Sequence, residues 1–352
     1  MHAHAAIQAK IDALPRRSLA FYPTPLHKLE RLSGHFGVNL YMKRDDLSGR
    51  GSFGGNKMRK LEFLIGDAIA QGCDTVVTFG AAQSNHAMQT VCACRACGLS
   101  PVLFLTTVVD FDPQDVRANM LVNEIMGAEM HLIPPQKGSV TDAFKRTQEL
   151  AAKRIGELEA DGRKVYVIPV GGTTSVGCVG FANAVLELCG QMDALEISPD
   201  FIAHSTGSGG TMAGLVAGKA LTQTQAAILS FSAFNPGGEE GEHAAFAAGM
   251  ANSVLEQVGV PQRVGAKDCT IDQNYFAPGY ELPNDLTDEA IKLLAREEGI
   301  LVDPVYSGKA LAGLFDYIHK GTIAPGSNVV FWHTGGVVAL FAEKEILGNI
   351  RN

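Results

Sequence analysis

A lysine that follows two glycines in the sequence is the first residue that could take part in catalysis. Lys57 follows Gly54, Gly55 and Asn56, and a helical pattern begins directly after it. Glycines let the backbone come close to a bulky ligand. A lysine held against such a ligand is desolvated, which favours its neutral, nucleophilic amine. The ordinary alternative, for this motif alone, is a surface lysine at a helix start.

A second candidate segment follows the apolar run at 75–79. It carries Gln83, Ser84, Asn85 and His86 at the expected start of a helix. The first N–H groups of a helix and its dipole attract anions, and polar side chains there add hydrogen bonds suited to a carboxylate. Helix capping by Ser84 or Asn85 explains the motif equally well and is compatible with ligand binding. We therefore expect this segment to bind a substrate carboxylate.

A glycine-rich loop between a strand and a helix predicts a phosphate site. Backbone N–H groups of such a loop surround phosphate oxygens, and hydroxyls add donors. The loop has neither the Gly-Lys-Ser/Thr of an ATP-binding loop nor the Gly-x-Gly-x-x-Gly spacing of a dinucleotide site. A merely tight turn is the alternative. The expected phosphate ligands are Thr206, Gly207, Ser208, Gly209, Gly210 and Thr211.

Tyr280, Tyr306 and Thr334 complete the set of candidates. Pro and Gly surround both tyrosines, which fixes their loops as a site requires, although a single tyrosine is more often a packed aromatic. Thr334 follows the last strong strand, where its hydroxyl could face a ring nitrogen or simply form a turn. The ordered combination of lysine, phosphate loop, carboxylate segment and hydroxyls suits pyridoxal 5'-phosphate acting on a small amino acid.

Composition limits the other classes of function. The chain has 352 residues, 46% hydrophobic and 19% charged, with a net charge of −8. That balance predicts about two globular domains and gives no basis for binding nucleic acid or a membrane surface. Residues 1–17 are polar and Ala-rich and lack the apolar core of a secretory signal, so none is expected. Seven scattered cysteines indicate free thiols in a cytoplasmic protein, and a metal site at Cys92, Cys94 and Cys97 is a minor alternative, so no metal is expected.

Apolar runs alternate with helical patterns along most of the chain. This alternation predicts an α/β fold with mostly parallel sheets covered on both faces. The expected strands are Asn39–Arg44, Thr75–Phe79, Val102–Thr106, Met130–Ile133, Val165–Val170, Phe201–Ser205, Ala227–Ala233 and Val329–His333. The expected helices lie near 58–71, 84–98, 114–127, 139–161, 175–191, 211–222, 287–298 and 308–320. A polar surface loop is expected at 237–241.

Six motifs, in this order, resemble the D-cysteine desulfhydrase / 1-aminocyclopropane-1-carboxylate (ACC) deaminase family. They are FGGNKMRKLEFL, GAAQSNHAMQT, TGSGGTMAGL, YFAPGYELPND, DPVYSGKALAGL and HTGG, and the resemblance runs from about Pro23 to Phe341. It implies the tryptophan-synthase-β-like fold (PLP fold type II) with two three-layer α/β domains, and commonly a homodimer. The expected division is a large cofactor-binding domain, 1–59 and 168–352, and a small domain, 60–167.

The resemblance also implies individual roles. Lys57 resembles the lysine that binds the cofactor covalently, and Asn56 the asparagine beside the phenolic oxygen of the cofactor. Residues 207–211 resemble the phosphate loop. Ser84, which could also assist proton transfer, belongs with its neighbours to the segment that resembles the carboxylate-binding one. The two loop tyrosines resemble the active-site pair near the reacting carbons of the substrate.

Two positions favour one activity within the family. ACC deaminases typically carry Glu after the second tyrosine and Leu before the final Gly-Gly, where this chain has Ser307 and Thr334. These hydroxyls resemble the desulfhydrase pattern. L-cysteate sulfo-lyase, ACC deaminase and a non-catalytic binding protein on the same scaffold remain alternatives. The segments 110–119 and 234–243 do not resemble familiar members, so substrate selection could differ there.

Overall fold

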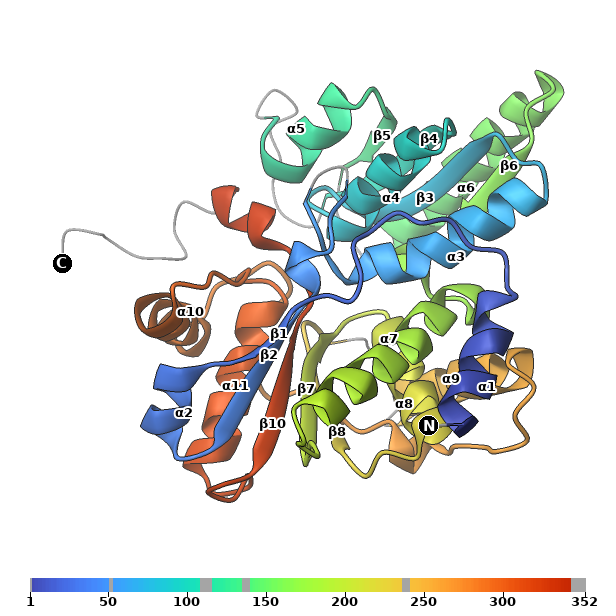
Figure 1. The fold of residues 1–352 in the computed structure, drawn as a ribbon. Helices are drawn as coiled ribbons and strands as arrows, with labels where there is room; N and C mark the ends of the chain where they lie inside the picture. Colours follow the sequence, from blue (N-terminus) through green and yellow to red (C-terminus); the bar gives the residue numbers. More distant parts are fainter. Residues whose placement is uncertain (1, 51–52, 108–115, 135–139, 236–240, 343–352) are drawn as a thin grey trace.

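The computed structural model describes residues 2–50, 53–107, 116–134, 140–235 and 241–342. Its strands form two separate sheets, each with helices against it (Figure 1). The strands are β1 (Leu26–Lys28), β2 (Asn39–Arg44), β3 (Thr75–Ala81), β4 (Ser100–Thr106), β5 (Glu129–Ile133), β6 (Val165–Ile168), β7 (Phe201–Thr206), β8 (Ala227–Ser232), β9 (Ile271–Asp272) and β10 (Asn328–His333).

The α-helices connect and cover these strands (Figure 1). They are α1 (His2–Asp12), α2 (Glu30–Phe36), α3 (Asn56–Ala70), α4 (Asn85–Ala96), α5 (Ala118–Ile125), α6 (Val140–Ala160), α7 (Ser175–Ala194), α8 (Gly210–Thr222), α9 (Glu242–Gln257), α10 (Asp285–Glu298) and α11 (Ser307–His319). Short 3-10 turns lie at Asp45–Leu47, Val170–Gly172, Ala266–Asp268 and Val337–Phe341.

The larger sheet has the strand order β1-β2-β10-β7-β8-β9 and is parallel except for β1. Its central strand β10 is apolar on both faces, as expected for a strand buried between two helical layers. Val329 and Phe331 pack in the core formed with α2, α10 and α11. Val330 and Trp332 pack on the opposite face with α7, α8 and α9.

The smaller sheet has the order β5-β4-β3-β6, and all of its pairings are parallel. Helices α4 and α6 pack against it, while α3 contacts both α4 and α7 and so links the two sheets (Figure 1). The carboxyl ends of parallel strands are where α/β sheets bind ligands. The start of α3, which carries Lys57, lies against such an end: Gly55 forms a β-bridge with Gly335, just beyond β10.

The α/β prediction with mostly parallel sheets is confirmed, and all eight expected strands and all eight expected helices are present. Sequence analysis missed α1, α2, α9, β1 and β9. Helix α9 is Ala-rich with little segregation of polar and apolar residues, so it lacks the periodic pattern by which helices are recognised. Strands β1 and β9 are only three and two residues long.

The smaller sheet is built entirely from residues 75–168, and the larger one from strands on either side of that stretch. The domain boundaries at 59/60 and 167/168 stay a prediction. Of the polar loop expected at 237–241, only Gly241 lies within the described residues.

Candidate functional site

Lys57 lies in the first turn of α3, held by contacts to the end of β10. The backbone N–H of Asn56 donates to the Thr334 carbonyl at 2.9 Å. Lys57 Nζ donates to Asn56 Oδ1 at 3.0 Å, and Asn56 Nδ2 donates to Thr211 Oγ1 at 3.1 Å. Burial lowers the pKa of Lys57 well below its ordinary value, and the charge of Lys60 lowers it further. The amine is therefore in its neutral, nucleophilic form at a lower pH than a surface lysine.

The predicted phosphate loop follows β7 and ends in the first turn of α8. Ser208 Oγ lies 2.7 Å from Thr173 Oγ1, and Thr206 Oγ1 is buried with no hydrogen-bond partner among the described residues. A Cβ on Gly210 would lie 2.6 Å from both Lys60 Nζ and Thr173 Oγ1, so any larger residue there would displace these two side chains. The loop thus offers backbone donors, hydroxyls and one close lysine to a ligand.

Lys60 is a further candidate site residue that the sequence motifs did not predict. Its side chain is 1% exposed, and Nζ donates to the Gly171 carbonyl at 3.0 Å. No carboxylate among the described residues forms an ion pair with it, and burial lowers its pKa to about 8. A buried cation without a counterion beside a phosphate loop fits a bound phosphate dianion. Helical spacing could have found it, because Lys57 and Lys60 are three residues apart on one helix face.

Of the four residues 83–86 at the start of α4, three line the pocket and one does not. Ser84 caps α4 by accepting from the Ala87 N–H at 3.1 Å, and it lines the pocket together with Asn85 and His86. Gln83 does not line the pocket, contrary to expectation. Its side chain is bound by the start of α5: Oε1 accepts from the Asn119 N–H at 3.0 Å, and Nε2 donates to the Arg117 carbonyl at 3.2 Å.

The two tyrosines come together across the pocket. Tyr280 OH and Tyr306 OH are 2.7 Å apart, so one phenol donates to the other and the donor of the accepting phenol is left for a ligand. Burial raises the pKa of Tyr280 well above its ordinary value, and also raises that of Tyr306, which keeps both phenols protonated. Ser307 Oγ lies 3.2 Å from Thr334 Oγ1 in the same region.

One pocket collects most of the predicted site residues. Those that line it are Asn56, Lys57, Ser84, Asn85, His86, Gly207, Ser208, Gly209, Thr211, Tyr280, Tyr306 and Thr334. Thr206, Gly210 and Ser307 lie directly behind this lining, next in sequence to residues of it or bonded to them.

The pocket also contains lining residues that were not predicted individually, including Gly171, Ser205 and Phe234, the first residue of the segment 234–243. Gly171 belongs to a second glycine-containing turn between β6 and α7, so the strand-turn-helix rule used for residues 206–211 could have identified it. Phe234 packs edge-on against Tyr280, with ring centroids 5.9 Å apart. Nothing local in the sequence indicates that contact.

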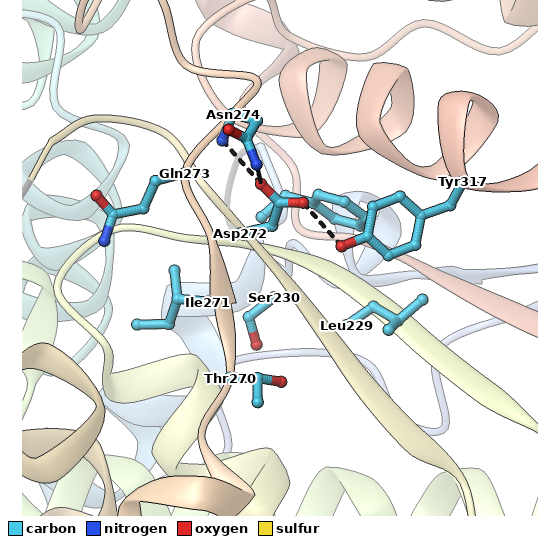
Figure 2. Close-up of a pocket in the computed structure, with 9 residues that line it drawn as sticks. Leu229, Ser230, Thr270, Ile271, Asp272, Gln273, Asn274 and Tyr317 are labelled. Atoms are coloured by element: carbon cyan, nitrogen blue, oxygen red, sulfur yellow. Dashed lines mark hydrogen bonds between the residues drawn. The ribbon is translucent and has the colours of Figure 1, made fainter. Parts of the chain in front are cut away.

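A second cavity lies between β8, β9 and α11, and Figure 2 shows its lining. Its only acidic side chain, Asp272, accepts hydrogen bonds from Tyr317 OH and from Asn274. None of the predicted site residues lines this cavity.

Three further findings on the described residues concern metal ligands, thiols and membrane-spanning helices. No group of three or more His, Cys, Asp or Glu side chains there could hold a metal ion. All seven cysteines are free thiols, and Cys92 packs against the sulfur atoms of Met88 and Met126 in a core cluster. No helix in these segments has the length and apolar character needed to cross a membrane.

The residues present fit pyridoxal phosphate. A low-pKa lysine suits its aldehyde, the loop at 206–211 with buried Lys60 suits its phosphate, and Asn56 can donate to its phenolic oxygen. The Ser307 and Thr334 hydroxyls can meet its ring nitrogen. These donors come from separate elements whose ends converge on one pocket.

Comparison with known proteins agrees with that fit. Residues 17–335 match the family model described as "Pyridoxal-phosphate dependent enzyme". The chain is 38% identical to a D-cysteine desulfhydrase of Klebsiella pneumoniae, over 94% of this chain and 97% of that protein. It is also 38% identical to a 1-aminocyclopropane-1-carboxylate deaminase of Burkholderia ambifaria, over 96% and 99% of the two chains.

The fold agrees as well. A crystal structure of an ACC deaminase homologue superposes with a TM-score of 0.83 at 33% sequence identity, and covers 96% of both chains. A threonine deaminase structure from Solanum lycopersicum, 19% identical with a TM-score of 0.63, shares the fold. The expected PLP fold type II is thereby confirmed, and the chain belongs to the pyridoxal-phosphate dependent enzymes, in the group that contains the D-cysteine desulfhydrases and ACC deaminases.

Proposed function

We propose that the protein converts D-cysteine and water to pyruvate, hydrogen sulfide and ammonia. The observation that carries this proposal is the hydroxyl pair formed by Ser307 and Thr334 at the end of β10. A carboxylate at this place would hold a ring nitrogen protonated and strengthen electron withdrawal, whereas hydroxyls do so weakly. Loss of a thiolate needs less electron withdrawal than opening a carbon ring, so this pair favours the elimination.

Bound pyridoxal phosphate supplies an electron sink for the electron pair left on the α-carbon when its proton departs. The chain supplies the proton transfers. Lys57 Nζ, whose pKa is well lowered, is the base for the α-proton, and Ser84 is a candidate relay. The Cβ–S bond breaks with its electron pair on sulfur, and the Tyr280–Tyr306 pair donates a proton to that thiolate. Water then releases the amine as ammonia.

The carboxylate of the substrate is assigned to the start of α4. The side chains of Ser84 and Asn85 line the pocket beside the first turn of that helix. His86 stays neutral, because burial lowers its pKa well below the ordinary value and Lys57 and Lys60 lower it further. Hydrogen-bond donors and the helix dipole, rather than an arginine, thus bind the carboxylate.

The pocket composition weighs against a sulfonate substrate. Lys57, whose amine favours the neutral form, is the only lysine that lines the pocket in the described structure, and no arginine does. A sulfonate would remain a fixed anion at the β-carbon and would need donors or positive charge of its own. L-Cysteate is therefore the less favoured substrate. ACC deaminase activity is the second candidate, because a relative of that name is 38% identical.

Three assays on the cofactor-loaded enzyme test the proposal. Sulfide released from D-cysteine, sulfite released from L-cysteate and 2-oxobutanoate formed from ACC are measured side by side. We expect sulfide from D-cysteine with the highest kcat/KM. Predominant 2-oxobutanoate or sulfite would contradict the proposal and assign the alternative activity, and absence of all three products would revive a binding role.

A further inference from the structure

We propose that Asn119 is a positioning residue that fixes the orientation of the Asn85 amide, so that its two N–H donors face the substrate carboxylate. This inference rests on the proposed role of Asn85 in carboxylate binding. Asn119 lies on α5, outside the pocket lining, and its side chain is fully buried. Asn119 is the last residue of the segment 110–119, where substrate selection could differ, and nothing in the sequence singles it out within that segment.

The orientation follows from a backbone carbonyl, which can only accept hydrogen bonds. The Gln83 carbonyl lies 2.8 Å from the Asn119 side-chain amide, so the amide atom that faces it must be Nδ2. The second hydrogen of Asn119 Nδ2 points to Asn85, also at 2.8 Å. Asn85 must therefore present Oδ1 to Asn119.

The consequence is that Asn85 Nδ2 is free. It donates to no described residue, and Asn85 lines the pocket. Gly336 leaves it room, because a Cβ at that position would lie 2.8 Å from Asn85 Nδ2. Without Asn119 the amide could rotate and present its oxygen, which would repel a carboxylate.

Gln83 explains how Asn119 is itself held in place. Its side chain accepts from the backbone N–H of Asn119 and donates to the Arg117 carbonyl, while its own carbonyl accepts from Asn119 Nδ2. Gln83 and Asn119 thus bind each other through side chain and backbone in both directions. The contribution of Gln83 to substrate binding is indirect, through Asn119 and Asn85.

The test compares two amines that differ only in a carboxylate. Alanine, in the enantiomer that the wild type binds more tightly, and ethylamine are titrated into the cofactor-loaded protein, and binding is read from the cofactor absorbance. Asn119→Ala should weaken alanine binding about tenfold or more, the effect of one hydrogen bond to a charged group, and leave ethylamine unchanged. Neither ligand has a leaving group, so this result is independent of whether D-cysteine yields sulfide.

Asn123→Ala is the matched control. Asn123 lies one turn further along α5, is equally buried, and its amide has no hydrogen-bond partner among the described residues. It should change neither affinity. In an Asn85→Ala background, Asn119→Ala should add no further loss, because the amide that it orients is gone. Equal weakening of both amines, no weakening, the same effect from Asn123→Ala, or full additivity with Asn85→Ala would each overturn the proposal.

Discussion

At the scale of single residues, the candidate site has two lysines in different electrostatic settings. Lys57 lies at the pocket wall and is directed at Asn56, whereas Lys60 is buried behind it against the loop that begins α8. Both have lowered pKa values because burial disfavours their charge. We assign the first to covalent chemistry and the second to phosphate binding, since Lys60 Nζ would lie 2.6 Å from a Cβ on Gly210 of the loop.

The assignment of Lys60 predicts a phosphate-specific effect. Pyridoxine 5'-phosphate has the phosphate but no aldehyde, so its affinity does not depend on bond formation at Lys57. Lys60→Met should weaken its binding, measured by fluorescence titration, by about tenfold or more through loss of one charged hydrogen bond. Lys153→Met, at a lysine that is 77% exposed, is the control and should leave the affinity unchanged.

The same assignment predicts a pH dependence. The pKa of Lys60 without ligand is about 8, so the ammonium that a phosphate requires is progressively lost above that pH. The affinity of wild type for pyridoxine 5'-phosphate should therefore fall as pH rises from about 7 to 9. Lys60→Met should flatten that slope, and an equally steep slope in the variant would refute the role.

At the scale of elements, a buried ionic network joins α3, α7 and the turn after β2. Arg59 donates to Asp45 at 2.8 Å and to Glu187 at 3.0 Å, and Lys43 also contacts Glu187. Arg59 is 2% exposed, and removing one partner from such a network leaves uncompensated charge. The network thus holds the helix that carries Lys57 against the larger sheet.

Glu187 makes the stability that this network contributes dependent on pH in the acid range. Burial alone raises the pKa of Glu187, but Arg59 and Lys43 lower it to about 2 in the folded protein. A depressed folded-state pKa adds stability above the ordinary value of 4.5, and that stability is lost as pH falls towards 2. Glu187→Gln should lower the free energy of unfolding by about 3 kcal/mol at pH 7.

Urea unfolding of the loaded enzyme between pH 7 and 3.5, followed by circular dichroism, checks this prediction. The gap between wild type and Glu187→Gln should narrow below about pH 4.5. Glu157→Gln is the control, because Glu157 is 47% exposed and its ion pairs lie at the surface. A gap that stays constant with pH would mean that the Glu187 charge does not stabilise the fold.

At the scale of the whole molecule, local sequence was enough to predict pocket-lining residues that lie together in one short segment. The loop at 206–211 and the start of α4 were predictable, because each lies between a strand and a helix that have clear patterns. Gln83 was expected to line the pocket and does not, because its side chain bonds to the start of α5, more than thirty positions away in the sequence. Lys60 lies three residues after Lys57 on one helix face, but its contact with Gly171 joins segments that are distant in the sequence.

The sheets could be predicted from the sequence more completely than the helices or the oligomeric state. Strands buried between helical layers show as continuous apolar runs, whereas the Ala-rich α9 gives no periodic signal. The homodimer and the cytoplasmic location stay predictions. A solution mass of twice 37.3 kDa by light scattering would support the dimer.

The central claim, that Lys57 binds the cofactor covalently, is tested most directly by locating the covalent link in the chain. The loaded enzyme is reduced with borohydride, digested and analysed by mass spectrometry. We predict one phosphopyridoxyl group, on the peptide that contains Lys57, and none in Lys57→Ala. A group on any other lysine, Lys60 included, or no modified peptide in cofactor-loaded protein would contradict the account.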